Sequence, residues 1–349
     1  MSDSIERRVT VADIAVEAGV SRATVSKVLN GRPDVAPATR AQIEATLVER
    51  GYILTKRTKR ARAADKRGGL IEMLFNDAST PWAVEMIRGG EAEARAARVG
   101  IVVSALGGGP KGAQQWLEDV ADRGSRGIIL ALSELSSADH KRIAKLGVPA
   151  ILVDPVGDFD SDVPSIGASN WGGGMAATQH LIDLGHRRIG TITGPMRFLC
   201  SQARLAGYRA ALERAGIPFD NGLVQHGDFH CTSGFKSALA LLDRPDPPSA
   251  IFAANDEQAV GVYAAVQQSD LGVPRDLSVV GFDDVPMSQW ITPPLTTVRQ
   301  PVADLAALAV RTLLAHAEGG ELPQGRIELS TTLVVRGSTA AQRARRRKG

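Results

Sequence analysis

TVADIAVEAGVSRATVSKVLNG, residues Thr10 to Gly31, sets the fold of the amino-terminal region. Thr10 suits a helix N-cap, with Asp13 three residues on as its partner in a capping box. Gly19 suits the end of that helix, because glycine enters a left-handed turn without steric cost. Ser21 then caps a second helix. The pattern predicts two short helices joined by a tight turn.

Helical spacing of apolar residues gives each of these helices a buried face. The buried positions are Val11, Ile14, Ala15 and Ala18 in the first helix and Val25, Val28 and Leu29 in the second. The outward face of the second helix consists of Arg22, Ala23, Ser26 and Lys27. A small, cationic helix face fits the major groove of DNA, which is about 12 Å wide. The alternative is an ordinary helical hairpin with a solvated polar face.

Charge is distributed unevenly along the 349-residue chain. Residues 1–67 carry 14 Lys/Arg and 8 Asp/Glu, residues 68–339 carry 22 and 30, and residues 340–349 carry five Lys/Arg and no acid. A basic head on an acidic body favours a polyanion-binding module joined to a sensor or an enzyme. Two cysteines, Cys200 and Cys231, indicate neither a disulfide framework nor a metal site. No signal peptide or membrane span is predicted, which favours the cytoplasm.

A third helix and a basic linker complete the amino-terminal region. The helix is predicted over 36–51, with Pro37 in its first turn and Ile43 and Leu47 on its buried face. Three such helices form a headpiece of about 50 residues, near the lower size limit for independent folding. Residues 55–69, TKRTKRARAADKRGG, include seven Lys/Arg. This linker is predicted to be disordered or marginally helical when free, either beside phosphates or simply solvated.

From Leu70 onward, short apolar runs alternate with helical patterns, which predicts parallel sheets flanked by helices. The first series has strands at 70–75, 101–105, 127–132 and 149–153 and helices at 81–98, 111–123 and 137–145. The second series has strands at 188–193, 222–226, 250–254 and 277–282 and helices at 172–184, 201–215, 232–242 and 256–269. The last elements, at 295–298, 302–318 and 331–336, are predicted to cross back and complete two lobes.

Polar residues directly after the predicted strands are the candidates for a ligand site. Ligands of open parallel sheets bind outside the carboxyl ends of the strands, and two facing lobes would bring those ends together across a cleft. The candidates are Asn76-Asp77, Asp154, Asn255-Asp256 and Asp283-Asp284. A single Asp at such a position is alternatively a helix cap, and we expect that role for Asp256 and Asp284.

Several motifs follow one another in a definite order over roughly residues 9 to 338, namely VTVADIAVEAGVSRATVSKVLNG, a basic hinge, HLIDLGHRRIGTITGP, ARLAGYRAAL, AIFAANDEQAVGVYAA, LSVVGFDD and PPLTTVRQP. Their order resembles that of the lactose-repressor (LacI/GalR) family. The resemblance implies a homodimeric repressor with an all-α helix-turn-helix headpiece (1–54), a hinge (55–69), an α/β two-lobed core like that of periplasmic binding proteins (70–338) and a basic disordered tail (339–349). Lobe 1 would comprise about 70–166 and 299–326, and lobe 2 about 167–298 and 327–338.

The resemblance also implies two sets of binding residues. At a double-stranded, pseudo-palindromic DNA operator, it implies base reading by Arg22, Ala23 and Lys27 and phosphate contacts by Ser21, Thr24, Ser26, Asn30, Thr39 and Arg40. For a small effector, usually a sugar, it implies Asn76, Trp82, Asp154, Arg204, Phe229, Asn255, Asp283 and Gln300. Carboxylates and amides would bind sugar hydroxyls, while an aromatic ring would cover the apolar face of the sugar. No cofactor or metal is implied.

The hinge departs from the family pattern. Leu54-Thr55 replaces a Pro-Asn pair, and Ala61 stands where the family has a Leu that wedges into the minor groove. Alanine is too small to unstack a base step as the larger wedges do. We expect the extra basic residues of the hinge to compensate through non-specific phosphate contacts, namely Lys56, Arg57, Lys59, Arg60 and Arg62. The tail lacks the leucine heptads that would join dimers into tetramers, so we expect a dimer.

The competing class is an enzyme on a doubly wound α/β scaffold that acts on a sugar or a nucleotide. The glycine-rich run at 107–112 follows a predicted strand but lacks the GxxxxGK[ST] spacing of a phosphate loop. The sequence contains no GxSxG motif, and its six histidines lack metal-ligand spacing. The sequence therefore favours a DNA-binding regulator controlled by a sugar.

Overall fold

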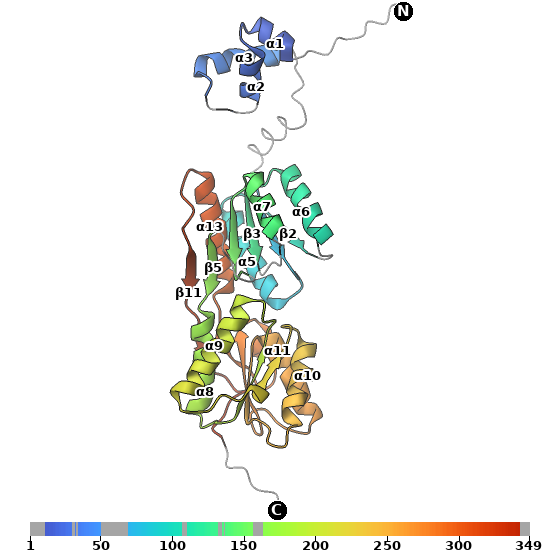
Figure 1. Ribbon diagram of the computed structural model, residues 1–349, viewed down its shortest axis with the longest axis vertical. Helices are drawn as coiled ribbons and strands as arrows, with labels where there is room; N and C mark the ends of the chain where they lie inside the picture. The colour runs from blue at the N-terminus through green and yellow to red at the C-terminus, as the bar shows by residue number, and fades with distance from the viewer. Residues whose placement is uncertain are drawn as a thin grey trace, which may run out of the picture. The chain divides into compact units, whose positions relative to one another are not determined.

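The chain forms two units, Met1–Gly69 and Leu70–Gly349, which are drawn in Figure 1. The computed structural model describes residues 11–29, 32, 34–49, 69–106, 110–131, 135, 137–155 and 163–342. Several predicted positions lie outside the described residues, namely Thr10, Asn30, Leu54, Thr55, Lys56, Arg57, Lys59, Arg60, Ala61 and Arg62.

The described residues of the amino-terminal unit form three helices that pack on one another, α1 (Val11–Glu17), α2 (Arg22–Leu29) and α3 (Pro37–Glu49). Gly19 has a φ of +61°, as the predicted left-handed turn between α1 and α2 requires. The Ser21 hydroxyl accepts a hydrogen bond from the Thr24 N–H at 3.1 Å and caps α2, as predicted. The helices share one apolar core, made of Ile14, Ala15, Ala18, Val25, Val28, Val35, Ile43 and Leu47.

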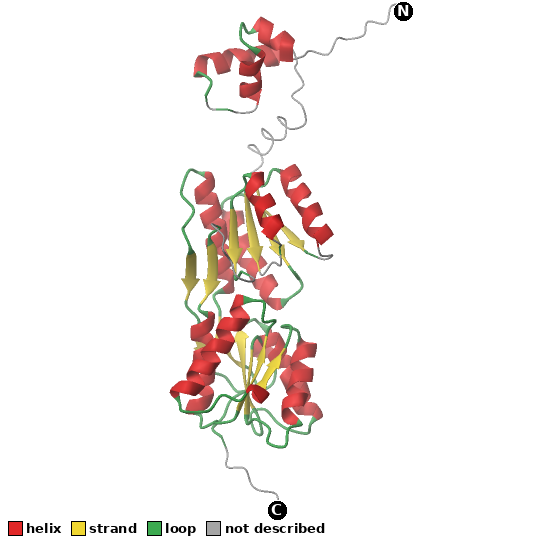
Figure 2. Cartoon of the chain, viewed as in Figure 1, coloured by secondary structure: helices red, strands yellow, loops and turns green. Residues whose placement is uncertain are grey.

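Lobe 1 of the second unit is a six-stranded sheet in the order β11-β5-β4-β3-β1-β2, with parallel pairing throughout. Its strands are β1 (Leu70–Phe75), β2 (Gly100–Ala105), β3 (Gly127–Ala131), β4 (Ala150–Val153), β5 (Ser165–Ala168) and β11 (Arg326–Leu329). Its helices are α5 (Pro81–Ala96), α6 (Pro110–Arg123), α7 (Ser137–Leu146) and α13 (Val302–Ala317), shown in red in Figure 2.

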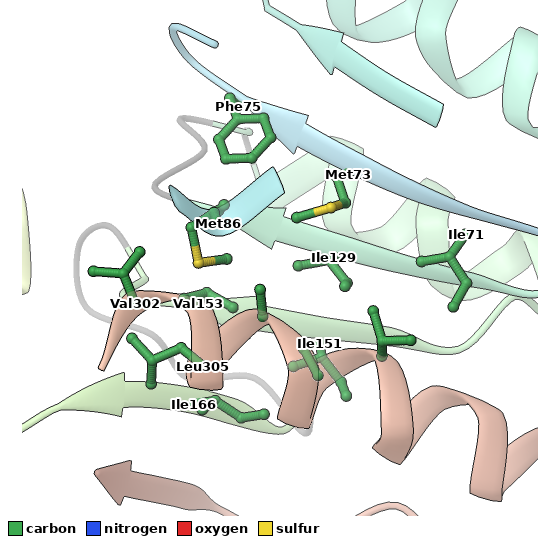
Figure 3. Close-up of a cluster of buried hydrophobic side chains, with 14 of the residues drawn as sticks. Ile71, Met73, Phe75, Met86, Ile129, Ile151, Val153, Ile166, Val302 and Leu305 are labelled. Atoms are coloured by element: carbon green, nitrogen blue, oxygen red, sulfur yellow. The ribbon is translucent and has the colours of Figure 1, made fainter. Parts of the chain in front are cut away.

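The helices of lobe 1 cover both faces of its sheet. On one face, Ile71 and Met73 of β1 share a core with Met86 of α5 and Leu305 of α13 (Figure 3). On the other face, Leu74 of the same strand packs with residues of α6 and α7. Side chains of a strand alternate between faces, so β1 is buried on both sides, as expected for a strand in a parallel sheet.

Lobe 2 repeats this architecture with the strand order β12-β10-β9-β8-β6-β7, in which only β12 is antiparallel to its neighbour. Its strands are β6 (Ile189–Thr193), β7 (Val224–His226), β8 (Ala250–Ala253), β9 (Ser278–Asp283), β10 (Thr296–Arg299) and β12 (Thr332–Val334). Its helices are α8 (Asn170–Asp183), α9 (Leu199–Arg214), α10 (Cys231–Leu242), α11 (Asp256–Gln268), the short α12 (Met287–Trp290) and the 3-10 turn η1 (Asn221–Leu223).

Glycines let two helix pairs of lobe 2 approach backbone to backbone. A Cβ atom added at Gly207 of α9 would lie 2.2 Å from the Trp171 carbonyl oxygen of α8. One added at Gly261 of α11 would lie 2.1 Å from the Cys231 carbonyl oxygen of α10. Neither position has room for a side chain, so the close packing of both pairs depends on glycine.

Three crossings of the chain join the lobes, from β5 to α8, from β10 to α13 and from β11 to β12. The sequence did not predict β5 or β11. Both strands are four residues long, β5 contains Gly167, and the residues of β11 are exposed or half-buried. Strands of this kind have no apolar run long enough to be distinguished from a loop.

The described carboxyl-terminal residues are bound to lobe 2. The Ala340 N–H donates to the Ser278 hydroxyl at 3.1 Å, and the Gln342 N–H donates to the Leu184 carbonyl oxygen at 2.8 Å. Packing against lobe 2 therefore continues through Gln342, which corrects the expected start of the disordered tail at residue 339. Among the described helices, none combines the length and the apolarity that a membrane-spanning segment needs.

Candidate functional site

The exposed face of α2 carries the residues that the sequence predicted for DNA reading. Arg22, Ala23, Ser26 and Lys27 are all exposed, and Thr24 is half-buried. Val25 and Val28 on the opposite face belong to the headpiece core, so the core fixes which side of the helix faces outward. The surface is small and cationic, as insertion into a major groove requires.

Two further predicted DNA-contact residues lie in the first turn of α3. Thr39 and Arg40 are half-buried there. The Arg40 guanidinium donates to the Arg32 carbonyl oxygen. This bond holds Arg40 at the turn between α2 and α3, while its remaining N–H groups are chemically suited to a phosphate.

A cavity of about 440 Å³ has walls from both lobes of the second unit. Lobe 1 contributes Asn76 and Trp82, at the end of β1 and the start of α5, and lobe 2 contributes Phe198 and Phe229. The rings of Phe198 and Phe229 lie 5.9 Å apart, centroid to centroid. The complete lining is Phe75, Asn76, Asp77, Thr80, Trp82, Ala131, Pro195, Arg197, Phe198, Gly227, Asp228, Phe229 and His230.

Arg204 of α9 lies at the centre of a buried polar cluster. Its Nε donates to Asn170 Oδ1 at 2.8 Å, and its Nη1 donates to the Ala254 carbonyl oxygen at 2.6 Å. The guanidinium also lies 3.8 Å from the centroid of the Phe282 ring. Phe229 connects this cluster to the cavity, because its ring centroid lies 5.9 Å from the same guanidinium.

The cluster joins acidic groups of both lobes. Asp154, which follows β4 of lobe 1, accepts a hydrogen bond from Asn170 Nδ2 at 3.3 Å. Asp283, the last residue of β9 in lobe 2, forms an ion pair with Arg204 at 3.8 Å. Asn170 begins α8 directly after the first crossing. One amide therefore binds a lobe 1 carboxylate and a lobe 2 guanidinium at the same time.

Asp283 and Gln300 form a second part of the predicted site. Gln300, at the crossing from β10 to α13, donates from Nε2 to Asp283 Oδ1 at 2.5 Å. Both residues line another cavity, of about 540 Å³, together with Glu85 and Arg88 of α5 and Asp304 of α13. The structure thus divides seven of the predicted effector residues among a cavity group, a buried cluster and this pair. Asn255 lies outside all three and donates from Nδ2 to the Phe229 carbonyl oxygen at 2.9 Å.

Burial dominates the electrostatics of the cluster. It raises the pKa of Asp283 from 3.8 to about 7, although the positive charge of Arg204 acts in the opposite direction. It also raises the pKa of Asp154 against the opposing charges of Arg204 and Arg326. Burial thus disfavours the ionised form of both carboxyls, and a ligand that donated hydroxyl hydrogens to them would stabilise that form.

The residues after β8 and β9 correct two expectations about helix caps. Asn255, rather than an aspartate, caps α11 by accepting a hydrogen bond from the Gln258 N–H at 2.8 Å. Asp256 accepts from the Thr297 hydroxyl at 2.5 Å and from the Val285 N–H at 3.0 Å, so it connects α11 to β10 and to the loop after β9. Asp284 forms ion pairs with arginines, one on β10 and one after β12.

Several residues of the site were missed by the sequence reasoning. Phe198 and Arg197 follow β6, and Asp228 and His230 follow β7. Asn76 was selected because ligands bind beyond the carboxyl ends of parallel strands, and this strand-end rule applies to these two loops too. Asn170 was missed because the strand before it was not predicted. Within the described part of the chain, no three His, Cys, Asp or Glu side chains come together as a metal site.

Comparison with known proteins identifies the family. The description "Bacterial regulatory proteins, lacI family" matches residues 10–54, and "Periplasmic binding protein-like domain" matches residues 178–339. The ribose operon repressor of Escherichia coli strain K12 is 35% identical over 330 residues, which cover 94% of this chain and 99% of the relative. The chain belongs to the lacI family of bacterial regulatory proteins, and its function is transcription regulation through DNA.

Two solved structures are similar over most of the chain. A complex of the transcriptional regulator CelR with cellobiose has a TM-score of 0.72 and 32% identity, covering 95% of this chain and 100% of that chain. The lac repressor dimer bound to operator and an anti-inducer has a TM-score of 0.71 and 30% identity, covering 96% and 100%. The predicted fold class, a helix-turn-helix headpiece with a two-lobed α/β core, is confirmed.

Proposed function

We propose that the chain is a homodimeric repressor that binds a pseudo-palindromic operator through α2 of each headpiece. Arg22 and Lys27 would donate to guanine acceptors in the major groove, while Ser21 and Thr24 would contact phosphates near the start of the helix. The similarity to an operator-bound dimer supports this arrangement. No catalytic step is assigned, because the relatives that match over the full chain are transcription regulators.

The effector proposed for the core is a small neutral sugar. The single observation that carries this proposal is the 440 Å³ cavity with aromatic and polar walls from both lobes. Trp82 and Phe229 offer apolar faces that suit a sugar ring, and Asn76, Asp228 and His230 offer hydrogen-bonding groups for its hydroxyls. The similarity to a regulator in complex with cellobiose supports a sugar of this kind.

A ligand in this cavity would couple the two binding events through the lobes. It would contact Asn76 of lobe 1 and Phe229 of lobe 2 at once, so its binding energy depends on how the lobes are placed. A dimer binds the operator tightly because its two headpieces contact two half-sites at the same time. A small change in the spacing of the headpieces prevents simultaneous contact and lowers the affinity for the operator. The effector would then change the affinity of the protein for the operator, and the operator would change its affinity for the effector by the same factor.

A thermal-shift experiment on the full chain tests the sugar proposal. The probes are D-ribose and cellobiose, with a sugar alcohol as the negative control. A bound sugar at 100 times its dissociation constant adds about 2.7 kcal/mol to the stability of the core. Phe229→Ala should remove most of this gain. Phe219→Ala, on a ring of the same lobe that packs against Tyr208 instead, should retain it. Equal gains in both variants would contradict the proposed cavity.

Fluorescence anisotropy tests the operator proposal. The probe is labelled duplex DNA taken from upstream of the chain's own gene, titrated at low salt with and without the sugar that raises the melting temperature. We expect binding with one dimer per duplex and a change in affinity on adding the sugar. Absence of binding at about 50 mM salt would count against the repressor, and turnover of cellobiose by the protein would support the enzyme instead.

A further inference from the structure

An acidic side chain lies beside the proposed DNA-reading surface. Asp34 lies in the turn between α2 and α3, and its Oδ2 accepts a hydrogen bond from Lys27 Nζ at 2.7 Å. The next residue, Val35, is buried in the headpiece core. This burial anchors the turn and keeps the carboxylate beside α2. Asp34 is thus held within reach of the lysine that we propose as a base reader.

Stability of the headpiece does not account for this ion pair. The Lys27 and Asp34 side chains are 50% and 55% exposed, and pairs with this much exposure contribute little to folding. The hydrogen bond from Lys27 lowers the pKa of Asp34, so the carboxyl stays ionised at neutral pH. A carboxylate so close to the recognition helix repels phosphates and occupies a cation that could otherwise bind one. Its effect on general DNA affinity is therefore unfavourable, which suggests a role in discrimination.

We propose that Asp34 is a specificity-determining residue that reads one G·C base pair together with Lys27 and weakens binding to other DNA. The inference rests on the proposed function, in which α2 enters the major groove. Lysine donates to guanine O6 and N7, and a carboxylate accepts from the N4 amino group of cytosine. A suitably placed G·C pair therefore offers a hydrogen-bond partner to both Lys27 and Asp34, and the two charged groups remain close to each other.

Other DNA does not satisfy the pair in this way. At a non-cognate site, Lys27 must leave Asp34 before it can neutralise a phosphate, and the carboxylate is then left facing the DNA backbone. An A·T pair with adenine in the place of guanine turns its N6 amino group toward Lys27 as a competing donor and the thymine O4 toward Asp34, whereas the opposite orientation matches both groups and lacks only the N7 acceptor. The carboxylate therefore penalises backbone binding through its charge, and it penalises the first orientation of an A·T pair through an unmatched acceptor.

Asp34→Asn tests this role because it removes the charge and keeps the size of the side chain. For random-sequence duplex DNA, we expect tighter binding, since Lys27 is released to contact a phosphate. The plot of log K against log[salt] should become steeper by about 0.9 for each headpiece. For the operator, selected by the wild-type protein from a randomised duplex library, the preference for one G·C pair per half-site should fall about tenfold.

Two further variants separate this mechanism from a change in net charge. Glu17→Gln removes one acidic charge from α1 of the same headpiece and should leave the slope and the base preference at their wild-type values. In a double-mutant cycle, Lys27→Met should abolish the effect of Asp34→Asn on the salt slope, because the proposed competition acts through the lysine. Circular dichroism of each full-length variant checks that the headpiece remains folded.

The outcomes distinguish this inference from the proposed function. If the wild-type protein selects an operator, but Asp34→Asn selects the same bases with the same salt slope, Asp34 has no reading role and only this inference fails. The same holds if Glu17→Gln steepens the slope equally, or if the effect persists without Lys27. If the wild-type protein binds neither duplex at about 50 mM salt, the proposed function itself fails and this inference fails with it.

Discussion

Burial of Asp283 predicts that removing its charge will stabilise the core. The residue is 6% exposed, and burial raises its pKa from 3.8 to about 7. The folded protein therefore holds a proton on this carboxyl more tightly than the unfolded chain does. The contribution of Asp283 to the free energy of unfolding is largest below pH 3.8, where the carboxyl is protonated in both states, and it is lost as the pH rises toward about 7. The loss grows by about 1.4 kcal/mol per pH unit in this window and reaches about 4 kcal/mol.

Asp283→Asn removes this cost while it keeps the shape of the side chain. Position 283 has a φ of +113°, and Asn tolerates positive φ about as well as Asp does. At pH 8 we expect the variant to be more stable than the wild-type protein by about 2–4 kcal/mol, and at pH 5 the difference should be smaller by about 2–3 kcal/mol. Urea unfolding of the full-length protein, followed by tryptophan fluorescence at several pH values, measures both quantities.

A matched variant excludes a simple backbone explanation. Asp270 also has a positive φ, of +56°, but its side chain is exposed. Asp270→Asn should therefore leave the free energy of unfolding almost unchanged at every pH. If Asp283→Asn is less stable than the wild-type protein at pH 8, or if its effect does not vary with pH, Arg204 compensates the carboxylate fully and the reasoning is wrong. A gain in stability together with a lost sugar response would be a trade-off between stability and function.

Three other substitutions or reactions test separate parts of the core. Arg123→Ala should destabilise lobe 1 by about 3–5 kcal/mol, because it leaves the fully buried Glu72 carboxylate without its cation, and thermal unfolding of the core measures this loss. Gly207→Ala should lower the melting temperature and loosen the α8–α9 pair, since the added methyl group would meet the Trp171 carbonyl oxygen; an unchanged melting temperature would contradict the close approach of the two backbones. Burial raises the pKa of Cys200 to about 12, so its thiol should resist a disulfide reagent at pH 8 until the core is unfolded with urea, and rapid labelling of the native protein would show that the thiol is accessible.

Local sequence patterns were sufficient for the headpiece and for most of the α/β core. Gly19 and Ser21 act at short range, through a left-handed turn and a cap, so their roles follow from residue type and spacing alone. The strands with continuous apolar runs, such as β3 and β4, were predicted close to their observed positions for a similar reason. Burial on both faces of a parallel sheet leaves a run that is visible in the sequence.

The predicted effector residues show where local reasoning reaches its limit. The strand-end rule selected Asp154 and Asp283, but it gave no information on their relation to each other. Asn170, which joins Asp154 to Arg204, follows a strand that the sequence did not reveal, and no local pattern shows that Phe198, after β6, shares a cavity with Asn76, after β1. These relations depend on how two lobes fold toward each other, which a residue-by-residue pattern does not encode.

The class of each unit follows from the order of residues alone, because caps, turns and apolar periodicity act over a few residues. The folded chain was needed to learn which polar groups share a cluster and which carboxyl is buried. It was also needed to learn that Lys27 is paired with Asp34 in the headpiece. Burial and charge pairing depend on residues that are far apart in the sequence and become neighbours only when the chain folds.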